Sequence, residues 1–176
     1  MTRLKTIEAE QAEGVAAQTL ESAPFNIFKG MANNPTVMEG LMALSGAISK
    51  SESLSPAEAE AAMLRVAERN GCEYCLAAHT TIASNHGVDS EAAVAFRRGE
   101  GTTSRESALL AFIDAILDRN GWVEDSELEA FRAAGFDDAA VVEAVAVIAW
   151  MTFTNTFNHV NRTKLDFPAV PEAAGT

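Results

Sequence analysis

The 176-residue sequence has few basic residues, few cysteines and few histidines. Lys and Arg together number 13 against 25 Asp and Glu, which gives a formal net charge of −12. Nucleic acids and anionic membranes bind clusters of Lys and Arg, so this charge argues against both kinds of partner. A small neutral or weakly charged substrate is easier to accommodate.

Other patterns are also missing from the sequence. The N-terminal stretch has no apolar segment typical of a signal peptide, so we expect a cytoplasmic protein. No unbroken run of about eighteen apolar residues is present, which argues against a membrane-spanning helix. We find no strand pattern, internal repeat or glycine-rich phosphate loop. A chain with 48% hydrophobic residues and this length can bury one core, so a single all-α domain is predicted.

Helix start and stop signals follow one another along the chain. The strongest is Ser55-Pro56 with Glu58, which provides an N-cap, a proline at the first helical position and a capping box. A segment broken by proline and glycine is expected at 24–35, and an extended tail at 165–176. Helices are predicted at 6–20, 37–48, 56–69, 72–83, from 89 or 90 to 99, 103–120, from 125 or 126 to 135, and from 137 onwards.

Both cysteines and one of the three histidines lie within residues 70–79. Asn70-Gly71 is a helix-ending signal, so a new helix is predicted to open at Cys72. Offsets of three, four and seven share one helix face, which places Cys72, Cys75 and His79 on the same side. The first turn of a helix favours a thiolate, and a neighbouring histidine can accept its proton. The pattern therefore predicts reactive cysteines.

A structural zinc site is the main alternative for this motif. Zinc in such sites usually has four protein ligands, whereas the sequence offers one CxxC pair and His79, without a second CxxC or an HxxxH. A thioredoxin-type motif would follow a strand, and no strand pattern is found. His79 alone is also compatible with an ordinary packed histidine. We favour redox chemistry over zinc.

Two glutamates near the capping box are assigned different roles. Glu58 is explained by its place in the cap, whereas Glu60 shares an apolar helix face and is predicted to point into the core. Burial would raise its pKa and suit it to proton transfer near neutral pH. Glu68 is the second choice for this role. His86 is predicted to belong to a helix cap, and His159 is equally compatible with a site residue or a structural one.

Several of these residues carry a resemblance to a known family. Leu54-Ser55-Pro56, Glu60, the segment Asn70-Gly71-Cys72-Glu73-Tyr74-Cys75 and His79 resemble the signature of the AhpD-like superfamily, which includes alkyl hydroperoxidases and carboxymuconolactone decarboxylases. Ala134-Gly135-Phe136, the segment 155–159 and Leu165-Asp166-Phe167-Pro168 resemble its peroxidase-related members. The resemblance covers about 54–168 and implies one AhpD-like helical bundle over 1–176. An N-terminal helical arm would occupy 1–35 and an extended tail 169–176.

The resemblance also implies roles for the site residues. Cys75 would be the peroxidatic thiol, Cys72 its resolving partner, His79 the proton acceptor and Glu60 part of the relay. The best-known hydroperoxidases have an additional histidine directly before the second cysteine, where this chain has Tyr74. A tyrosine cannot shuttle protons in the same way near neutral pH, so a shorter relay and slower turnover are expected.

The leading functional hypothesis is a peroxidase that reduces hydrogen peroxide or organic hydroperoxides through a CxxC thiol/disulfide cycle. An external dithiol would restore the pair, and neither a metal nor another cofactor is required. One alternative is a lactone decarboxylase-like activity in which the cysteines are incidental. Another is a non-enzymatic, thiol-based or zinc-binding sensor of oxidants.

The last predicted helix indicates assembly, because residues 141–157 are apolar on nearly all sides. We expect a homo-oligomer, and the resemblance implies a trimer or a multiple of it. One side of the helix is expected to pack in the core and the opposite side against a partner. The first set is Val141, Val145, Ile148, Met151 and Thr152, and the second is Val142, Ala146, Ala149, Trp150 and Phe153.

Overall fold

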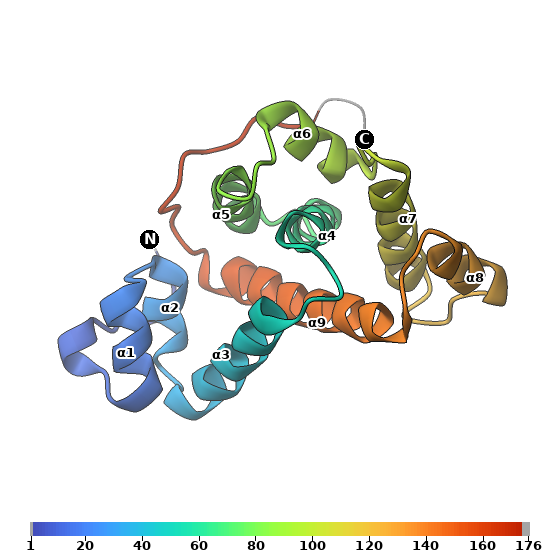
Figure 1. Cartoon of the computed structure of the whole chain (residues 1–176). Helices are drawn as coiled ribbons and strands as arrows, with labels where there is room; N and C mark the ends of the chain where they lie inside the picture. The colour runs from blue at the N-terminus through green and yellow to red at the C-terminus, as the bar shows by residue number, and fades with distance from the viewer. Residues whose placement is uncertain (1, 174–176) are drawn as a thin grey trace.

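The computed structural model describes residues 2–173, which form helices joined by loops and no strand (Figure 1). The predicted all-α class is therefore confirmed. The last three residues of the expected tail lie outside the described residues. The elements are a 3-10 helix η1 (Ala9–Gln11) and the α-helices α1 (Gly14–Ser22), α2 (Asn26–Met31), α3 (Pro35–Lys50), α4 (Pro56–Arg69), α5 (Glu73–Ser84), α6 (Ser90–Arg98), α7 (Ser104–Asp118), α8 (Asp125–Ala133) and α9 (Asp138–Asn161).

Helix α4 lies at the centre of the bundle, in contact with α5, α6, α7 and α9 (Figure 1). Its buried residues are largely alanines and medium-sized apolar side chains, which allow several neighbours to approach it closely. The predicted capping box is present, because Ser55 Oγ accepts from the Glu58 amide at 3.2 Å and Glu58 Oε2 accepts from the Ser55 amide at 2.8 Å. Glu58 also pairs with Arg105 at 2.6 Å, which gives it a structural role.

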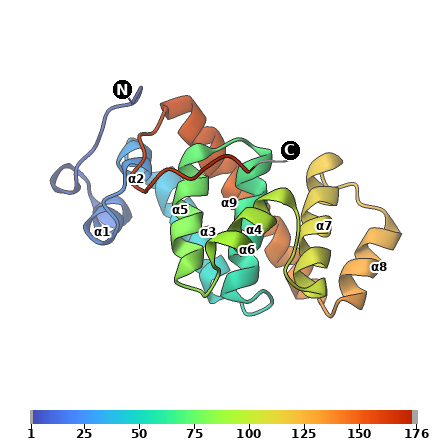
Figure 2. The ribbon, with the colours of Figure 1, turned by 90° about the horizontal axis from the view of Figure 1, so that it is seen from above.

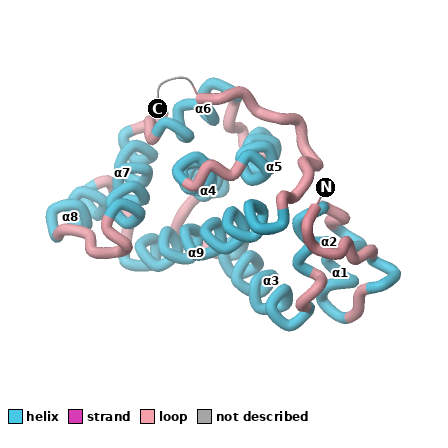
Figure 3. The backbone as a smooth tube through the Cα atoms, turned by 180° about the vertical axis from the view of Figure 1, so that it is seen from behind, coloured by secondary structure: helices cyan, strands magenta, loops and turns pink. Residues whose placement is uncertain are grey.

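The N-terminal region differs from the sequence prediction. Residues 6–20 do not form one helix, because η1 ends at Gln11 and α1 starts at Gly14. Gly14 has a φ of +59°, a left-handed conformation that interrupts a continuous α-helix. The segment 24–35, expected to be irregular, contains the short helix α2. As Figure 3 shows, α1 and α2 lie with α3 at one end of the molecule, and α7 and α8 lie at the other.

Helix α9 packs against α4 and α3, but its predicted faces are partly wrong. Trp150 is buried, whereas Val145 and Thr152 are exposed. The buried face includes Glu143 and Asn155, so polar residues do not mark the side of this helix that faces solvent. Glu143 is accommodated there because its carboxylate accepts from the Leu54 amide at 3.1 Å.

By length and composition alone, α9 is the one helix in the described range that could cross a membrane. Core helices of soluble proteins meet the same criterion. Here 44% of the most apolar window is buried against the rest of the chain. Its buried Glu143 and Asn155 also fit a core helix better than a lipid-facing one.

After α9 the chain continues as an extended strap, residues 163–173, which passes α5 and ends beside α6 (Figure 2). Two contacts fix its course. Asp166 accepts from the Asn26 amide at 2.7 Å, and the Pro171 carbonyl accepts from Arg97 at 2.8 Å. The strap thus joins the N-terminal helices to α6, and the expected extended tail is present as far as residue 173.

Candidate active site

The CxxC motif forms the junction between α4 and α5. Cys72 is the N-cap of α5, and its sulfur accepts from the backbone N–H of Cys75 at 3.3 Å. The two sulfur atoms lie 2.7 Å apart, and both cysteines are free and buried. An N-cap sulfur is exposed to the positive end of the helix dipole, which favours a negative charge at this position.

Glu60 and His79 meet across the interface between α4 and α5. His79 Nδ1 lies 2.9 Å from Glu60 Oε2, and Glu60 is 7% exposed. The structure thus places Glu60 on the buried face that its sequence pattern predicts. Because Nδ1 is held by the carboxylate, Nε2 is the nitrogen left to exchange a proton.

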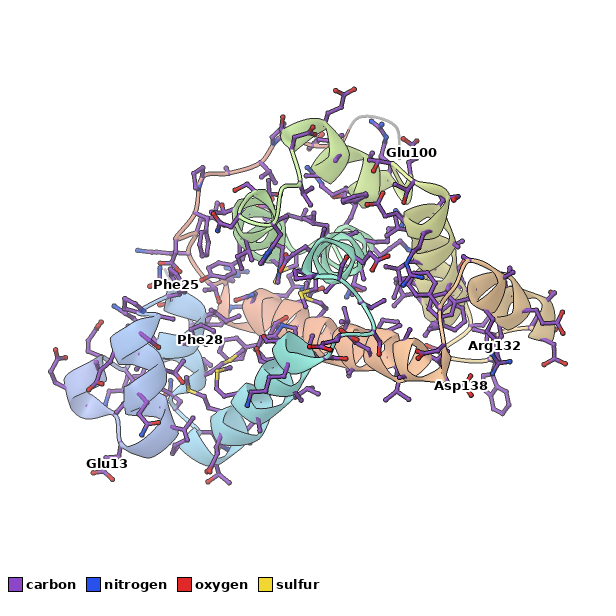
Figure 4. The ribbon with its side chains drawn as sticks, viewed as in Figure 1. Glu13, Phe25, Phe28, Glu100, Arg132 and Asp138 are labelled. Atoms are coloured by element: carbon purple, nitrogen blue, oxygen red, sulfur yellow. The ribbon has the colours of Figure 1, made fainter. Side chains whose placement is uncertain are left out.

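A cavity of about 310 Å³ adjoins these residues. Cys75, His79 and Glu60 line it, whereas Cys72 does not. Phe25 and Phe28, labelled in Figure 4, contribute from the start of α2, on the side of that helix towards the rest of the molecule. The remaining lining residues are mostly apolar or uncharged and come from α2, α3, α4, α5, the turn after α5, α9 and the strap: Ile27, Ser45, Ser49, Met63, Tyr74, Ala78, Ile82, His86, Trp150, Thr154 and Phe167.

Electrostatics favours Cys72 as the thiolate, whereas access to the cavity favours Cys75 as the sulfur that contacts a substrate. The hydrogen bond from Cys75 lowers the pKa of Cys72 in spite of burial, and the Cys75 backbone amide and Asn158 lower it further. The same contact with Cys72, followed by burial, raises the pKa of Cys75. The pair therefore loses its first proton from Cys72, while Cys75 keeps its proton and faces the cavity.

Tyr74, between the two cysteines, has a structural environment. Its hydroxyl donates to Asp166 at 2.5 Å, and its ring packs edge-on against Phe167. Burial, and then the hydrogen bond to Asp166, raises its pKa well above the ordinary value. The phenol therefore stays protonated near neutral pH and anchors the strap, as expected for a residue that does not replace a histidine shuttle.

Of the other residues considered from the sequence, Glu68 and His159 do not line the cavity, whereas His86 does. Glu68, the second choice for proton transfer, pairs with Arg97 at 2.7 Å. His159 is exposed, and its Nε2 lies 3.2 Å from the carbonyl oxygen of Gly71. His86 is exposed near the end of α5 and lines the cavity.

No role for Asn158 is predicted from the sequence, although its Nδ2 lies 3.3 Å from Cys75 Sγ. Asn155 is buried one turn earlier on α9. The sequence signal for these residues was a pair of amides three residues apart in an otherwise apolar helix. This spacing alone does not predict that they lie beside the cysteines. Within residues 2–173 no group of three or more His, Cys, Asp or Glu residues is arranged to hold a metal ion.

Comparison with known proteins adds a family and a fold. Residues 35–118 match the model of the carboxymuconolactone decarboxylase family. No curated protein matches the sequence.

Three solved structures share the fold. An uncharacterised peroxidase-related protein with an alkylhydroperoxidase AhpD core, from Ralstonia eutropha, has a TM-score of 0.84 and 21% identity over 94% of this chain and 92% of that chain. A peroxidase-related protein from a Silicibacter species has a TM-score of 0.75 and 20% identity over 85% and 82%. A cysteine-to-alanine variant of the debrominase Bmp8, in complex with 2,3,4-tribromopyrrole, has a TM-score of 0.76 and 19% identity over 94% and 92%.

The family match contains α4, the CxxC motif and His79, and the AhpD-like fold extends over nearly the whole chain. The fold is therefore AhpD-like, and just under half of the chain matches the carboxymuconolactone decarboxylase family model.

Proposed function

We propose that this protein is a cysteine-based peroxidase of the cytoplasm that reduces hydroperoxides through a Cys72/Cys75 thiol/disulfide cycle. One observation carries the proposal: Cys75 lines a cavity beside the His79–Glu60 pair, with the sulfur of Cys72 at 2.7 Å. An attacking sulfur must touch the peroxide, so access decides in favour of Cys75 as the peroxidatic residue. Cys72 is its resolving partner.

The first step oxidises Cys75. Its proton passes to the neighbouring sulfur of Cys72, and the resulting Cys75 thiolate attacks the terminal oxygen of the hydroperoxide. A sulfur–oxygen bond forms and the oxygen–oxygen bond breaks, so the sulfur is oxidised by two electrons to a sulfenic acid. The other peroxide oxygen leaves as alkoxide and becomes an alcohol by taking a proton from solvent.

The second step closes the disulfide. His79, oriented by Glu60, accepts the proton of Cys72, and the Cys72 thiolate attacks the Cys75 sulfur. The sulfur–sulfur bond forms as the sulfur–oxygen bond breaks, and hydroxide leaves as water with the proton from His79. An external dithiol then returns two electrons to the pair and is itself oxidised to a disulfide.

The cavity favours uncharged organic hydroperoxides. Its volume of about 310 Å³ exceeds what hydrogen peroxide needs and lies at the lower end of the range for small-molecule sites. Aromatic side chains, including Phe25, Trp150 and Phe167, provide apolar contact. None of the described residues that line it is Lys or Arg, so a carboxylated lactone would find no permanently charged cation there. This charge pattern disfavours the lactone decarboxylase alternative.

Reductive dehalogenation is a second candidate, favoured by the fold of the debrominase and by the aromatic cavity. A thiolate would take bromine from an aromatic carbon, which then accepts a proton. The second thiolate would displace bromide as the disulfide forms. Bromide release from a brominated pyrrole by the reduced protein distinguishes this reaction from peroxide reduction.

Stopped-flow oxidation of the reduced protein by several hydroperoxides tests the proposed function. Wild type should lose two thiols per peroxide, and Cys75→Ser should lose the fast reaction. Cys72→Ser, in which solvent must take the Cys75 proton, should react once and more slowly, and leave a sulfenic acid trappable by a dimedone-type reagent. Trapping at Cys72 in the Cys75→Ser protein at the wild-type rate would reverse the roles of the two cysteines. Peroxide consumption that persists at the wild-type rate in a variant lacking both cysteines would refute the proposal.

A further inference from the structure

Two buried asparagines of α9 face the cysteine pair and take no part in the steps above. Asn158 Nδ2 lies 3.3 Å from Cys75 Sγ and 3.9 Å from Cys72 Sγ. Asn158 is 4% exposed, and Asn155, one turn earlier, is 1% exposed. Burying an amide that is not fully hydrogen-bonded costs stability, so a helix with two of them at this place indicates a functional use.

Each amide has one polar atom without a hydrogen-bond partner, Nδ2 in Asn155 and Oδ1 in Asn158. Asn70, at the end of α4, donates to Asn155 Oδ1 at 2.9 Å and so fixes the orientation of that amide. Asn155 favours the Cys75 thiolate, although its Nδ2 makes no hydrogen bond of ordinary geometry. One donor and one acceptor are therefore unpaired beside the reactive sulfur.

We propose that Asn155 and Asn158 form a paired amide site that binds the oxygen atom which Cys75 takes from the peroxide. The inference rests on the proposed function and adds two residues that contact the reacting atoms. The two amide nitrogens donate to the oxygen of a sulfenate, and Asn158 Oδ1 accepts the hydrogen of a neutral sulfenic acid.

The chemistry explains why amides suit this place. Before oxidation, Asn158 Nδ2 donates to the sulfur and stabilises a thiolate. As the sulfur–oxygen bond forms, negative charge moves from sulfur to oxygen, and donors already in position need no reorganisation. When Cys72 attacks, the same donors stabilise the departing hydroxide. Both amides are neutral, so they leave the proton count of the cycle unchanged.

Asn158→Leu tests the contact with sulfur, because leucine has a similar shape and no donor. The pH midpoint of the thiolate ultraviolet absorbance should rise, and the oxidation rate near neutral pH should fall about tenfold. This loss is smaller than the loss caused by removing a donor to an oxyanion, because hydrogen bonds to sulfur are longer. Asn158→Asp, which preserves shape and replaces the donor with a carboxylate, should move the midpoint in the same direction. His79, Glu60 and Tyr74, the other titratable groups that line the cavity beside Cys75 together with His86, are unchanged in both variants.

Asn161→Leu is the matched control. Asn161 is equally buried on α9, but it accepts from the Leu4 amide at 3.0 Å and donates to Thr163 at 3.1 Å, away from the sulfur atoms. It should match the Asn158 variants in lost stability and wild type in thiolate midpoint. This difference separates a contact with sulfur from a general loss of packing.

The oxygen-binding role is tested in the Cys72→Ser background, where the sulfenic acid cannot be resolved. Adding Asn155→Leu should shorten the lifetime of the sulfenic acid several-fold, measured by delayed addition of a dimedone-type reagent. The inference would be overturned if the folded Asn155 and Asn158 variants had the same sulfenic acid lifetime and the same thiolate pH midpoint as their parent proteins. That result would not affect the proposed peroxidase function. No sulfenic acid with any peroxide, even with both asparagines present, would overturn both.

Discussion

At the scale of single residues, the hydrogen bond between Glu60 and His79 is the feature whose removal is most informative. Glu60→Gln maintains the shape of the side chain but removes the carboxylate that orients the imidazole. We expect disulfide formation to slow about 10- to 100-fold, within the range of general acid–base catalysis, and the rate–pH profile to move. Stopped-flow measurement across pH, with thiol counting at each point, follows the change.

Glu58→Gln is the matched control for this experiment. Glu58 lies on the same helix and is also buried, but its partners are the Ser55 amide and Arg105. Its loss should lower the free energy of unfolding by about 1–2 kcal/mol, as for other helix caps, without shifting the rate–pH profile. An unchanged profile in Glu60→Gln would contradict the proton relay, and a shift only in Glu68→Gln would transfer the role to Glu68.

The positions of these glutamates, one in a helix cap and one on the buried face, could be predicted because local patterns determine them. Ser55 followed three residues later by Glu58 is a cap wherever a helix starts, and Glu60 on an apolar face must be buried once that helix packs. The contact between Asn158 and Cys75 joins residues 83 positions apart and depends on how α9 crosses α5, so no local pattern could give it. The anchoring of Tyr74 by Asp166 has the same origin.

At the scale of elements, helix starts were predicted well where the N-cap is explicit. Thr103 and Asp137 accept from backbone amides at the starts of α7 and α9, as their sequences indicate. The prediction was wrong at α1, because its apolar spacing continues across Gly14, where the backbone is left-handed. It was partly wrong for the faces of α9, because buried polar residues and exposed valines obscure the periodicity.

The strap provides a prediction about selectivity. Phe167 packs against Phe25, with ring centroids 4.9 Å apart, and forms part of the cavity wall. Phe167→Ala should enlarge the cavity and change the ratio of oxidation rates for a bulky and a small hydroperoxide by about tenfold, the scale on which apolar pockets discriminate. Second-order rate constants for cumene hydroperoxide and tert-butyl hydroperoxide provide the ratio.

Val170→Ala is the control for the strap, because Val170 lies on the same segment but outside this cavity. Its ratio should equal that of wild type. The same ratio in Phe167→Ala and wild type would show that the strap does not influence substrate choice. Equal changes in both variants would point to loosening of the whole strap rather than to its aromatic wall.

At the scale of the whole molecule, α9 leaves an apolar face uncovered. Val142 is 70% exposed, Val145 50%, Val160 54% and Phe153 36%, and these residues recur along one side of the helix. Contiguous apolar surface of this kind is uncommon on soluble monomers and marks an interaction site. We propose a second copy of this chain as the partner, in agreement with the oligomer expected from the sequence. Trp150, expected on the partner face, is instead buried beside the cavity.

Light scattering coupled to gel filtration tests this assembly. Wild type at micromolar concentration should elute with a mass that is a multiple of 18.7 kDa. Val145→Glu should shift the mass towards that of the monomer, because burying a carboxylate without an opposite charge beside it is costly. Trp122→Glu is the control, since Trp122 is 83% exposed in the loop between α7 and α8. A monomeric wild type would contradict the proposal. An unchanged oligomer in Val145→Glu would place the interface on another surface, whereas dissociation with intact helicity would assign it to α9.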